Sequence, residues 1–114
     1  MDHLLTALQP ADLNQRRTIA VLSLPDLRAL PSFARSDAAG LDARVREWNT
    51  AIAEVVGRHA PDAVLVDLYG SWAELGAHPE YISGDGFHPS SAGYRRIADF
   101  VLDTLRRHDP ALDR

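Results

Sequence analysis

Two short apolar runs, residues 18–24 and residues 62–68, constrain the fold of this chain more than any other feature. Both are rich in Val, Ile and Leu and are bounded by polar or turn-forming residues, which is typical of strands buried on both faces of a parallel sheet. Apolar residues recur at helical intervals over residues 38–59, and again over residues 91–107. The order strand, helix, strand, helix predicts an α/β unit with a parallel pair of strands and a right-handed crossover.

Both helical patterns have a defined apolar stripe. The stripes consist of Leu41, Val45, Trp48, Ile52, Val55 and Val56 in the first helix and Tyr94, Ile97, Ala98, Val101, Leu102 and Leu105 in the second. These positions predict that the aromatic rings of Trp48 and Tyr94 belong to the core rather than to a substrate platform. Ser90 is suited to cap the second helix, and Asp67 to cap the loop that follows the second strand.

The N-terminal residues add one more element. Residues 3–8 predict a short helix, which Pro10 ends. The start of the chain lacks a basic segment followed by an apolar one, so we expect no signal peptide.

The predicted sheet is too small to stand alone. Two strands that are apolar on both faces are not easily covered by about three helices, and the first strand should keep an unpaired edge. We therefore expect this chain to be part of a larger sheet.

Composition narrows the possible functions. The chain has no cysteine, which excludes disulfides and thiolate nucleophiles. Its formal net charge of −4 argues against a nucleic-acid partner. No apolar run approaches the roughly 20 residues that span a bilayer, so we expect a protein without a membrane partner, located in the cytoplasm.

Asp85 and His88 are the candidate catalytic residues, because a carboxylate three residues from an imidazole on a turn can accept a hydrogen bond from Nδ1. That bond would direct Nε2 toward a partner as a general base. The spacing alone is weak evidence, since Asp85 could simply cap a turn and His88 could be a solvated loop residue. His78 and Glu80 lie nearby and could join the pair as metal ligands, but their spacing matches no zinc motif. We expect no metal and no cofactor.

The longer segment around this pair is more specific. Residues 85–98 read Asp-Gly-Phe-His-Pro-Ser-x-x-Gly-Tyr-x-x-Ile-Ala, which closely resembles the last sequence block of the SGNH/GDSL hydrolases. Residues 21–27 resemble that family's strand ending in a proline loop, and residues 48–52 and 64–69 look like its next helix and strand. The resemblance covers roughly residues 18–105.

The resemblance implies a flavodoxin-like three-layer α/β/α sandwich of the SGNH hydrolase type, here incomplete, with two parallel strands and about three helices. It implies hydrolysis of a small-molecule carboxylic ester by a Ser-His-Asp triad through an acyl-serine, with no cofactor. His88 would be the general base and Asp85 its orienting partner.

Other blocks of the family are absent from the sequence. There is no Gly-Asp-Ser block for the nucleophile and no Gly-x-Asn-Asp block for the oxyanion hole, and the surroundings of Asn14 do not qualify it for that role. None of the seven serines follows a strand in a nucleophile elbow. We therefore expect residues 1–114 to form a single partial domain, the C-terminal half of a hydrolase, and to be inactive alone.

Three arrangements remain open at this stage. The chain could pair with a missing N-terminal half, either in the same protein or on a separate polypeptide. It could instead be a non-catalytic, degenerate module or an oligomerising interaction domain that forms a homodimer through its open strand edge.

Overall fold

The computed structural model describes residues 1–7 and 17–109. Within these ranges the helices and strands are α1 Asp2–Ala7, β1 Ile19–Leu22, α2 Ala38–Arg58, β2 Ala63–Val66, α3 Leu68–Ser71 and α4 Ser91–His108. The predicted order of strands and long helices is confirmed, and so is the short N-terminal helix. Pro10 and Asn14 lie outside the described residues.

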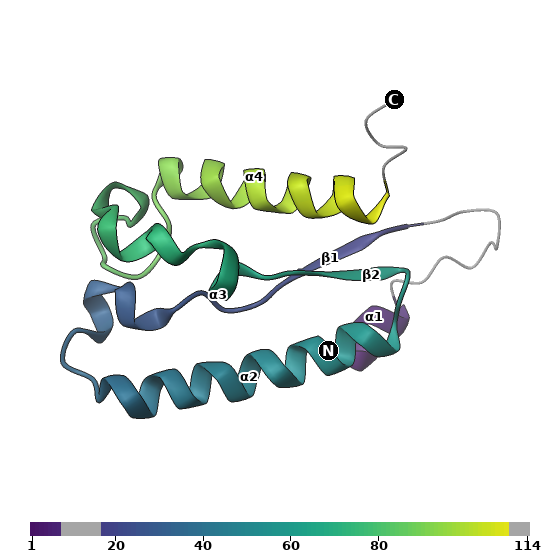
Figure 1. Cartoon of the computed structure of the whole chain (residues 1–114), viewed down its shortest axis with the longest axis horizontal. Coiled ribbons are helices and arrows are strands. Elements are labelled where there is room, and N and C mark those ends of the chain that lie inside the picture. The colour runs from purple at the N-terminus through teal and green to yellow at the C-terminus, as the bar shows by residue number, and fades with distance from the viewer. Residues whose placement is uncertain (8–16, 110–114) are drawn as a thin grey trace.

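The elements form three layers. In Figure 1, α4 lies above the two strands and α2 below them, and the strands cross in projection, so the sheet is seen edge-on. β1 and β2 pair in parallel, with Ile19 opposite Ala63 and Leu22 opposite Val66. The chain therefore has an α/β fold, as expected of a partial flavodoxin-like sandwich.

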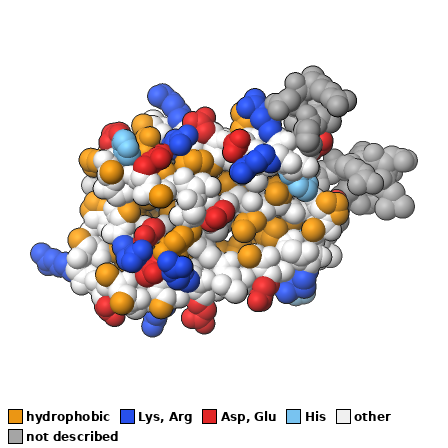
Figure 2. Space-filling view, viewed as in Figure 1, with side chains coloured by type: hydrophobic (Ala, Val, Ile, Leu, Met, Phe, Trp, Pro, Cys, Tyr) orange, Lys and Arg blue, Asp and Glu red, His pale blue; other side chains and the backbone are white. Residues whose placement is uncertain are grey.

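Two apolar clusters hold the layers together. One joins α1, α2 and the sheet through the buried side chains of Leu5, Val56 and Ala63. The other lies beyond the carboxyl ends of the strands, where Leu30, Trp72 and Leu75 are buried. Figure 2 shows hydrophobic side chains in the band between the long helices, with charged side chains of both signs around them.

The segment between β1 and α2, expected to be a loop, contains two 3-10 helices, Leu27–Ala29 and Pro31–Phe33. Two more, Ala73–Ala77 and Pro79–Tyr81, follow α3. These short helices pack around the apolar cluster of Leu30, Trp72 and Leu75, and the last of them leads to the loop before α4. None of the helices in the described ranges is long and apolar enough to cross a membrane.

The prediction that Trp48 and Tyr94 belong to the core is wrong. The side chain of Trp48 is 64% exposed and that of Tyr94 is 57% exposed. On α2, the buried side is defined by Val45 and Val56, and Trp48 lies about 60–80° away from it around the helix axis. A sheet of two strands is too narrow to cover this flank.

Asn49 joins α2 to the end of β1. Its Oδ1 accepts a hydrogen bond from the Leu24 amide at 2.8 Å, and its Nδ2 donates to the Leu24 carbonyl at 2.9 Å. The side-chain amide thus occupies both backbone groups of Leu24, as a neighbouring strand would. The rest of this edge of β1 has no strand beside it in the described part of the chain, which confirms the predicted unpaired edge.

Candidate functional site

The loop between the last 3-10 helix and α4 is closed on itself by backbone hydrogen bonds. Ile82 and Pro89 form an isolated antiparallel bridge. The Ser83 amide donates to the His88 carbonyl at 2.8 Å, and the Gly86 amide donates to the Ser83 carbonyl at 3.0 Å. These bonds make residues 83–88 a compact turn with defined side-chain directions.

The Asp85 carboxylate is the centre of this turn. Its Oδ1 accepts hydrogen bonds from Ser83 Oγ at 2.7 Å, from the Phe87 amide at 2.8 Å and from the His88 amide at 2.9 Å. Its Oδ2 lies 2.5 Å from Nδ1 of His88. The backbone contacts fix the carboxylate, and the carboxylate in turn fixes the imidazole.

The His88 ring is presented to solvent. Its side chain is 64% exposed, and its ring meets the Phe87 ring edge-on at a centroid distance of 4.9 Å. Nε2 has no hydrogen-bond partner among residues 1–7 and 17–109. The structure therefore brings together the two residues selected from the sequence and leaves one imidazole nitrogen open. Asp85 also caps the turn, so the two interpretations of its role are compatible.

Ser32, which is far from the turn in the sequence, supports it through two hydrogen bonds. Ser32 Oγ donates to the Asp85 carbonyl at 3.0 Å, and the Ser32 amide donates to the Gly86 carbonyl at 3.1 Å. Gly86 has a φ of 71°, and a Cβ there would lie 3.1 Å from Pro31 Cβ. Sequence analysis missed this support, because no local signal links Ser32 to a loop more than fifty residues later.

The start of α4 anchors the other end of the loop. Ser90 Oγ accepts a hydrogen bond from the Gly93 amide at 3.1 Å, which confirms the predicted cap, and donates to the Glu80 carbonyl at 2.5 Å. A Cβ on Gly93 would lie only 2.1 Å from the Tyr81 carbonyl oxygen. The absence of a side chain at this position lets α4 pack directly on the preceding turn.

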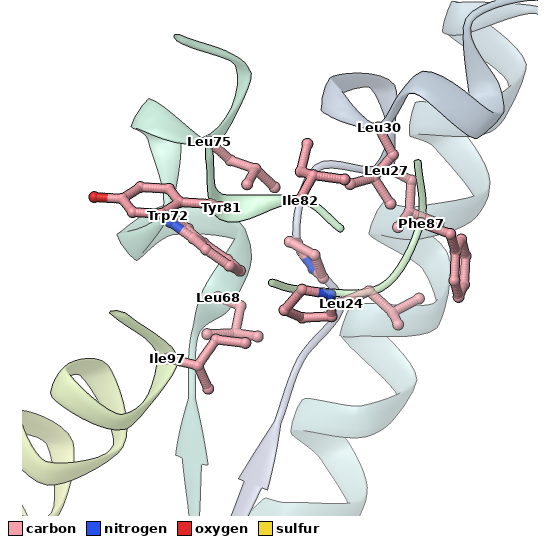
Figure 3. A pocket seen from close by; sticks show the side chains of 12 residues that line it. Leu24, Leu27, Leu30, Leu68, Trp72, Leu75, Tyr81, Ile82, Phe87 and Ile97 are labelled. Carbon is pink, nitrogen blue, oxygen red and sulfur yellow. The ribbon is translucent and has the colours of Figure 1, made fainter. Parts of the chain in front are cut away.

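An apolar pocket of about 180 Å³ lies next to the loop (Figure 3). Its lining comes from the segments after β1 and β2, the loop itself and α4: Leu24, Pro25, Leu27, Leu30, Leu68, Trp72, Leu75, Tyr81, Ile82, Phe87, Pro89 and Ile97. Phe87 and Pro89, the two neighbours of His88, both belong to it. The pocket was not visible in the sequence because its walls come from separate segments.

His78 and Glu80 form a second histidine–carboxylate pair, with Nδ1 2.7 Å from Oε1. The histidine ring stacks near the Tyr81 ring at a centroid distance of 5.1 Å. This pair does not join Asp85 and His88 in a metal cluster, and no group of three or more potential metal ligands occurs within the described ranges.

Several side-chain hydroxyls of the chain have hydrogen-bond partners elsewhere. Ser23 Oγ is buried and accepts from the Leu68 amide at 2.9 Å, and Ser83 and Ser90 serve the loop. No serine, threonine or tyrosine in the described part hydrogen-bonds to His88. Residues 8–16 and 110–114 contain none of these residue types.

Asp67 caps α3 by accepting a hydrogen bond from the Gly70 amide at 3.0 Å, as expected from its position.

The hydrogen bond with His88, followed by those from Ser83 and the turn amides, holds the pKa of Asp85 well below its ordinary value of 3.8. Because the folded-state pKa is lowered, Asp85 stabilises the fold fully above pH 3.8, and this contribution is lost as the pH falls through the lowered value.

We expect Asp85→Asn to reduce the free energy of unfolding at neutral pH, and the difference from wild type to shrink in strong acid. Urea unfolding over a pH series measures this. Glu47→Gln, on the exposed side of α2, serves as control, and a difference that grows in acid would contradict the prediction.

Comparison with known proteins adds to this geometry. Residues 3–96 match the model of the GDSL-like Lipase/Acylhydrolase family. The chain belongs to that family. This GDSL-like domain is also similar to the "O-acetyltransferase OatA" of Staphylococcus aureus strain NCTC 8325 / PS 47 and to that of strain COL. It is 29% identical to each over 80 residues, which are 69% of this chain and 13% of those proteins. No solved structure matches the chain.

Proposed function

We propose that this GDSL-like domain hydrolyses carboxylic esters, with His88 as general base and Asp85 as its orienting partner. One observation carries the proposal: Nδ1 of the exposed His88 ring lies 2.5 Å from Asp85 Oδ2, while Nε2 has no hydrogen-bond partner among the described residues. A carboxylate in this position fixes the imidazole tautomer and stabilises the imidazolium that forms when Nε2 takes a proton.

No hydroxyl in the described part hydrogen-bonds to His88, so in this proposal the hydroxyl that attacks the ester is supplied from outside residues 1–114. As its oxygen bonds to the ester carbonyl carbon, its proton passes to Nε2. Nε2 then returns that proton to the departing alkoxide when the carbonyl re-forms, leaving an acyl group on the nucleophile. Attack by water on the acyl group, with the same proton transfers, releases the acid and restores the hydroxyl.

Hydrolysis of p-nitrophenyl acetate tests the role of His88 on the chain as it exists. Without a bound nucleophile, most of the effect of a triad is lost, so we expect only a slow release of p-nitrophenol, first-order in protein and above the buffer rate. His88→Gln should remove most of this excess. Asp85→Asn should lower it, because the imidazole is then no longer oriented.

His78→Gln is the matched control, because His78 is also an exposed histidine whose Nδ1 faces a carboxylate. It should leave the excess rate unchanged. Equal rates for wild type and His88→Gln, or equal losses at His88 and His78, would remove the basis of the proposal.

A second candidate function is transfer of an acyl group to an alcohol. The name of the Staphylococcus aureus relatives, O-acetyltransferase, favours it, and the same base could deprotonate an acceptor alcohol instead of water. Product analysis in the presence of a polyol distinguishes the two: hydrolysis gives acetate alone, and transfer gives the acetylated polyol.

A further inference from the structure

The apolar pocket beside the Asp85–His88 loop is backed by packed core side chains. Leu68, Trp72 and Leu75 line it and are all buried, and Trp72 and Leu75 belong to the apolar cluster beyond the strands. The most exposed of the lining side chains is Phe87, at 45%. The pocket is therefore preformed by the core, and its most exposed side is the loop.

The lining of the pocket is hydrocarbon. Every lining residue is apolar or aromatic, and none of this described set is charged. Tyr81 and Trp72 carry polar side-chain atoms, but in Figure 3 both atoms lie on the sides of their rings that face away from Leu24 and Ile82. A hydroxyl or a charge placed in the pocket would lose its hydration without gaining a partner, which is unfavourable. We therefore expect a hydrocarbon group as the occupant.

The volume of the pocket sets the size of that group. It measures about 180 Å³, and a dry apolar cavity of about 150 Å³ is large enough to bind benzene. Pockets that take drug-sized ligands measure about 300–1,000 Å³. The pocket therefore suits a group of about six carbon atoms and is too small for a long chain.

The position of the pocket relates it to the His88 ring. Phe87 and Pro89, the chain neighbours of His88, both line it, and the Phe87 ring meets the imidazole edge-on at a centroid distance of 4.9 Å. In the proposed reaction Nε2 returns a proton to the departing oxygen, which must then come within about 3 Å of Nε2. The group attached to that oxygen is thus the part of the ester nearest to Phe87.

We propose that this pocket binds the alcohol portion of the ester, as an aliphatic or aromatic group of about six carbon atoms. The assignment rests on the proposed function, because the proton transfer from Nε2 is what places the departing oxygen. In the bound ester the hydrocarbon group fills the pocket past Phe87, and the departing oxygen remains at the mouth beside His88. The acyl group lies outside the pocket.

Binding of straight-chain alcohols tests the pocket on the chain as it exists, without any nucleophile. Each methylene that enters the pocket should tighten binding about fourfold. We expect the affinity to rise by this factor from ethanol to about hexanol and then to level off. Methyl NMR spectra measure it, with the largest shifts at Leu24, Leu27 and Ile82. An affinity that keeps rising to decanol, or the absence of shifts at these residues, would overturn the proposal.

Two variants should change the chain length that the pocket admits. Leu27→Ala enlarges the pocket, so the affinity should go on rising for about two or three carbons beyond hexanol. Ile82→Phe fills the pocket and should weaken hexanol binding at least about tenfold. Leu102→Ala is the matched control, because Leu102 is an exposed leucine of α4 that does not line the pocket, and it should change nothing.

Far-UV circular dichroism establishes that each of these variants is folded. The same affinity series in Leu27→Ala, Ile82→Phe and wild type would contradict the proposal.

Esters of p-nitrophenol separate the alcohol portion from the acyl portion. With the p-nitrophenyl ring in the pocket, lengthening the acyl group from acetate to hexanoate should leave the His88-dependent rate nearly unchanged, and hexanol should inhibit that rate by competition. A rate that rises about fourfold per methylene of the acyl group would place the acyl chain in the pocket and overturn the assignment.

The two measurements fail in different ways. Hexanol binding that levels off as expected, without a His88-dependent rate, would remove the proposed function and with it the alcohol assignment, and the apolar site would remain. A His88-dependent rate in a chain that binds no alcohol would overturn the pocket assignment alone.

Discussion

Trp72→Ala is expected to destabilise the chain by about 3–5 kcal/mol, the range for removing a large buried aromatic side chain. Trp72 is only 3% exposed, and its ring lies 5.8 Å from that of Tyr81 and 6.0 Å from that of Phe100. It connects the turn before the Asp85–His88 loop to α4. Because small domains are stable by about 5–15 kcal/mol, such a loss leaves a substantial unfolded fraction, which urea unfolding followed by far-UV circular dichroism detects.

Trp72→Phe provides the graded comparison. Nε1 of Trp72 is the one buried side-chain polar atom without a hydrogen-bond partner within the described ranges, and an unsatisfied buried donor is itself unfavourable. Phenylalanine removes this donor and retains an aromatic ring, so we expect a much smaller loss than with alanine. Equal losses for the two variants would show that the packing of the ring is not what stabilises this region.

Gly93→Ala is expected to be the second large effect. The added Cβ would lie 2.1 Å from the Tyr81 carbonyl oxygen and 3.1 Å from Pro89 Cβ. The backbone cannot yield as a flexible side chain would, so α4 must move away from the loop, at a cost of about 1–3 kcal/mol or more. Because Ser90 and Pro89 move with it, the His88-dependent rate should fall as well. Thermal unfolding and the p-nitrophenyl acetate assay measure the two effects.

The control for this substitution is Gly57→Ala in α2. No atom lies within 4 Å of the Cβ position there, and alanine is favoured over glycine inside a helix by about 0.5–1 kcal/mol. We expect this variant to be as stable as wild type or more so. An unaffected Gly93→Ala variant would mean that the close approach of α4 to Tyr81 is not required.

The sequence predicted the elements whose signal is periodic or local. The helix over residues 38–59 and the parallel strands followed from apolar spacing. The Asp85–His88 contact could be predicted because both residues belong to one turn. Contacts between distant segments could not be, and Ser32, which supports this turn, is the clearest case. Trp48 was misplaced because a helical stripe shows which residues are apolar, not whether the sheet beneath is wide enough to cover them.

The hydrogen bonds from Ser32 to the turn at Asp85 and Gly86 have a consequence for the dynamics of the loop. Ser32, in the segment after β1, donates two of the hydrogen bonds that hold the turn of the imidazole–carboxylate pair. We expect local opening of that segment, residues 27–33, to loosen the turn, and the two should exchange their amide hydrogens together. The orientation of the His88 ring by Asp85 thus depends in part on a short pair of 3-10 turns more than fifty residues earlier in the chain.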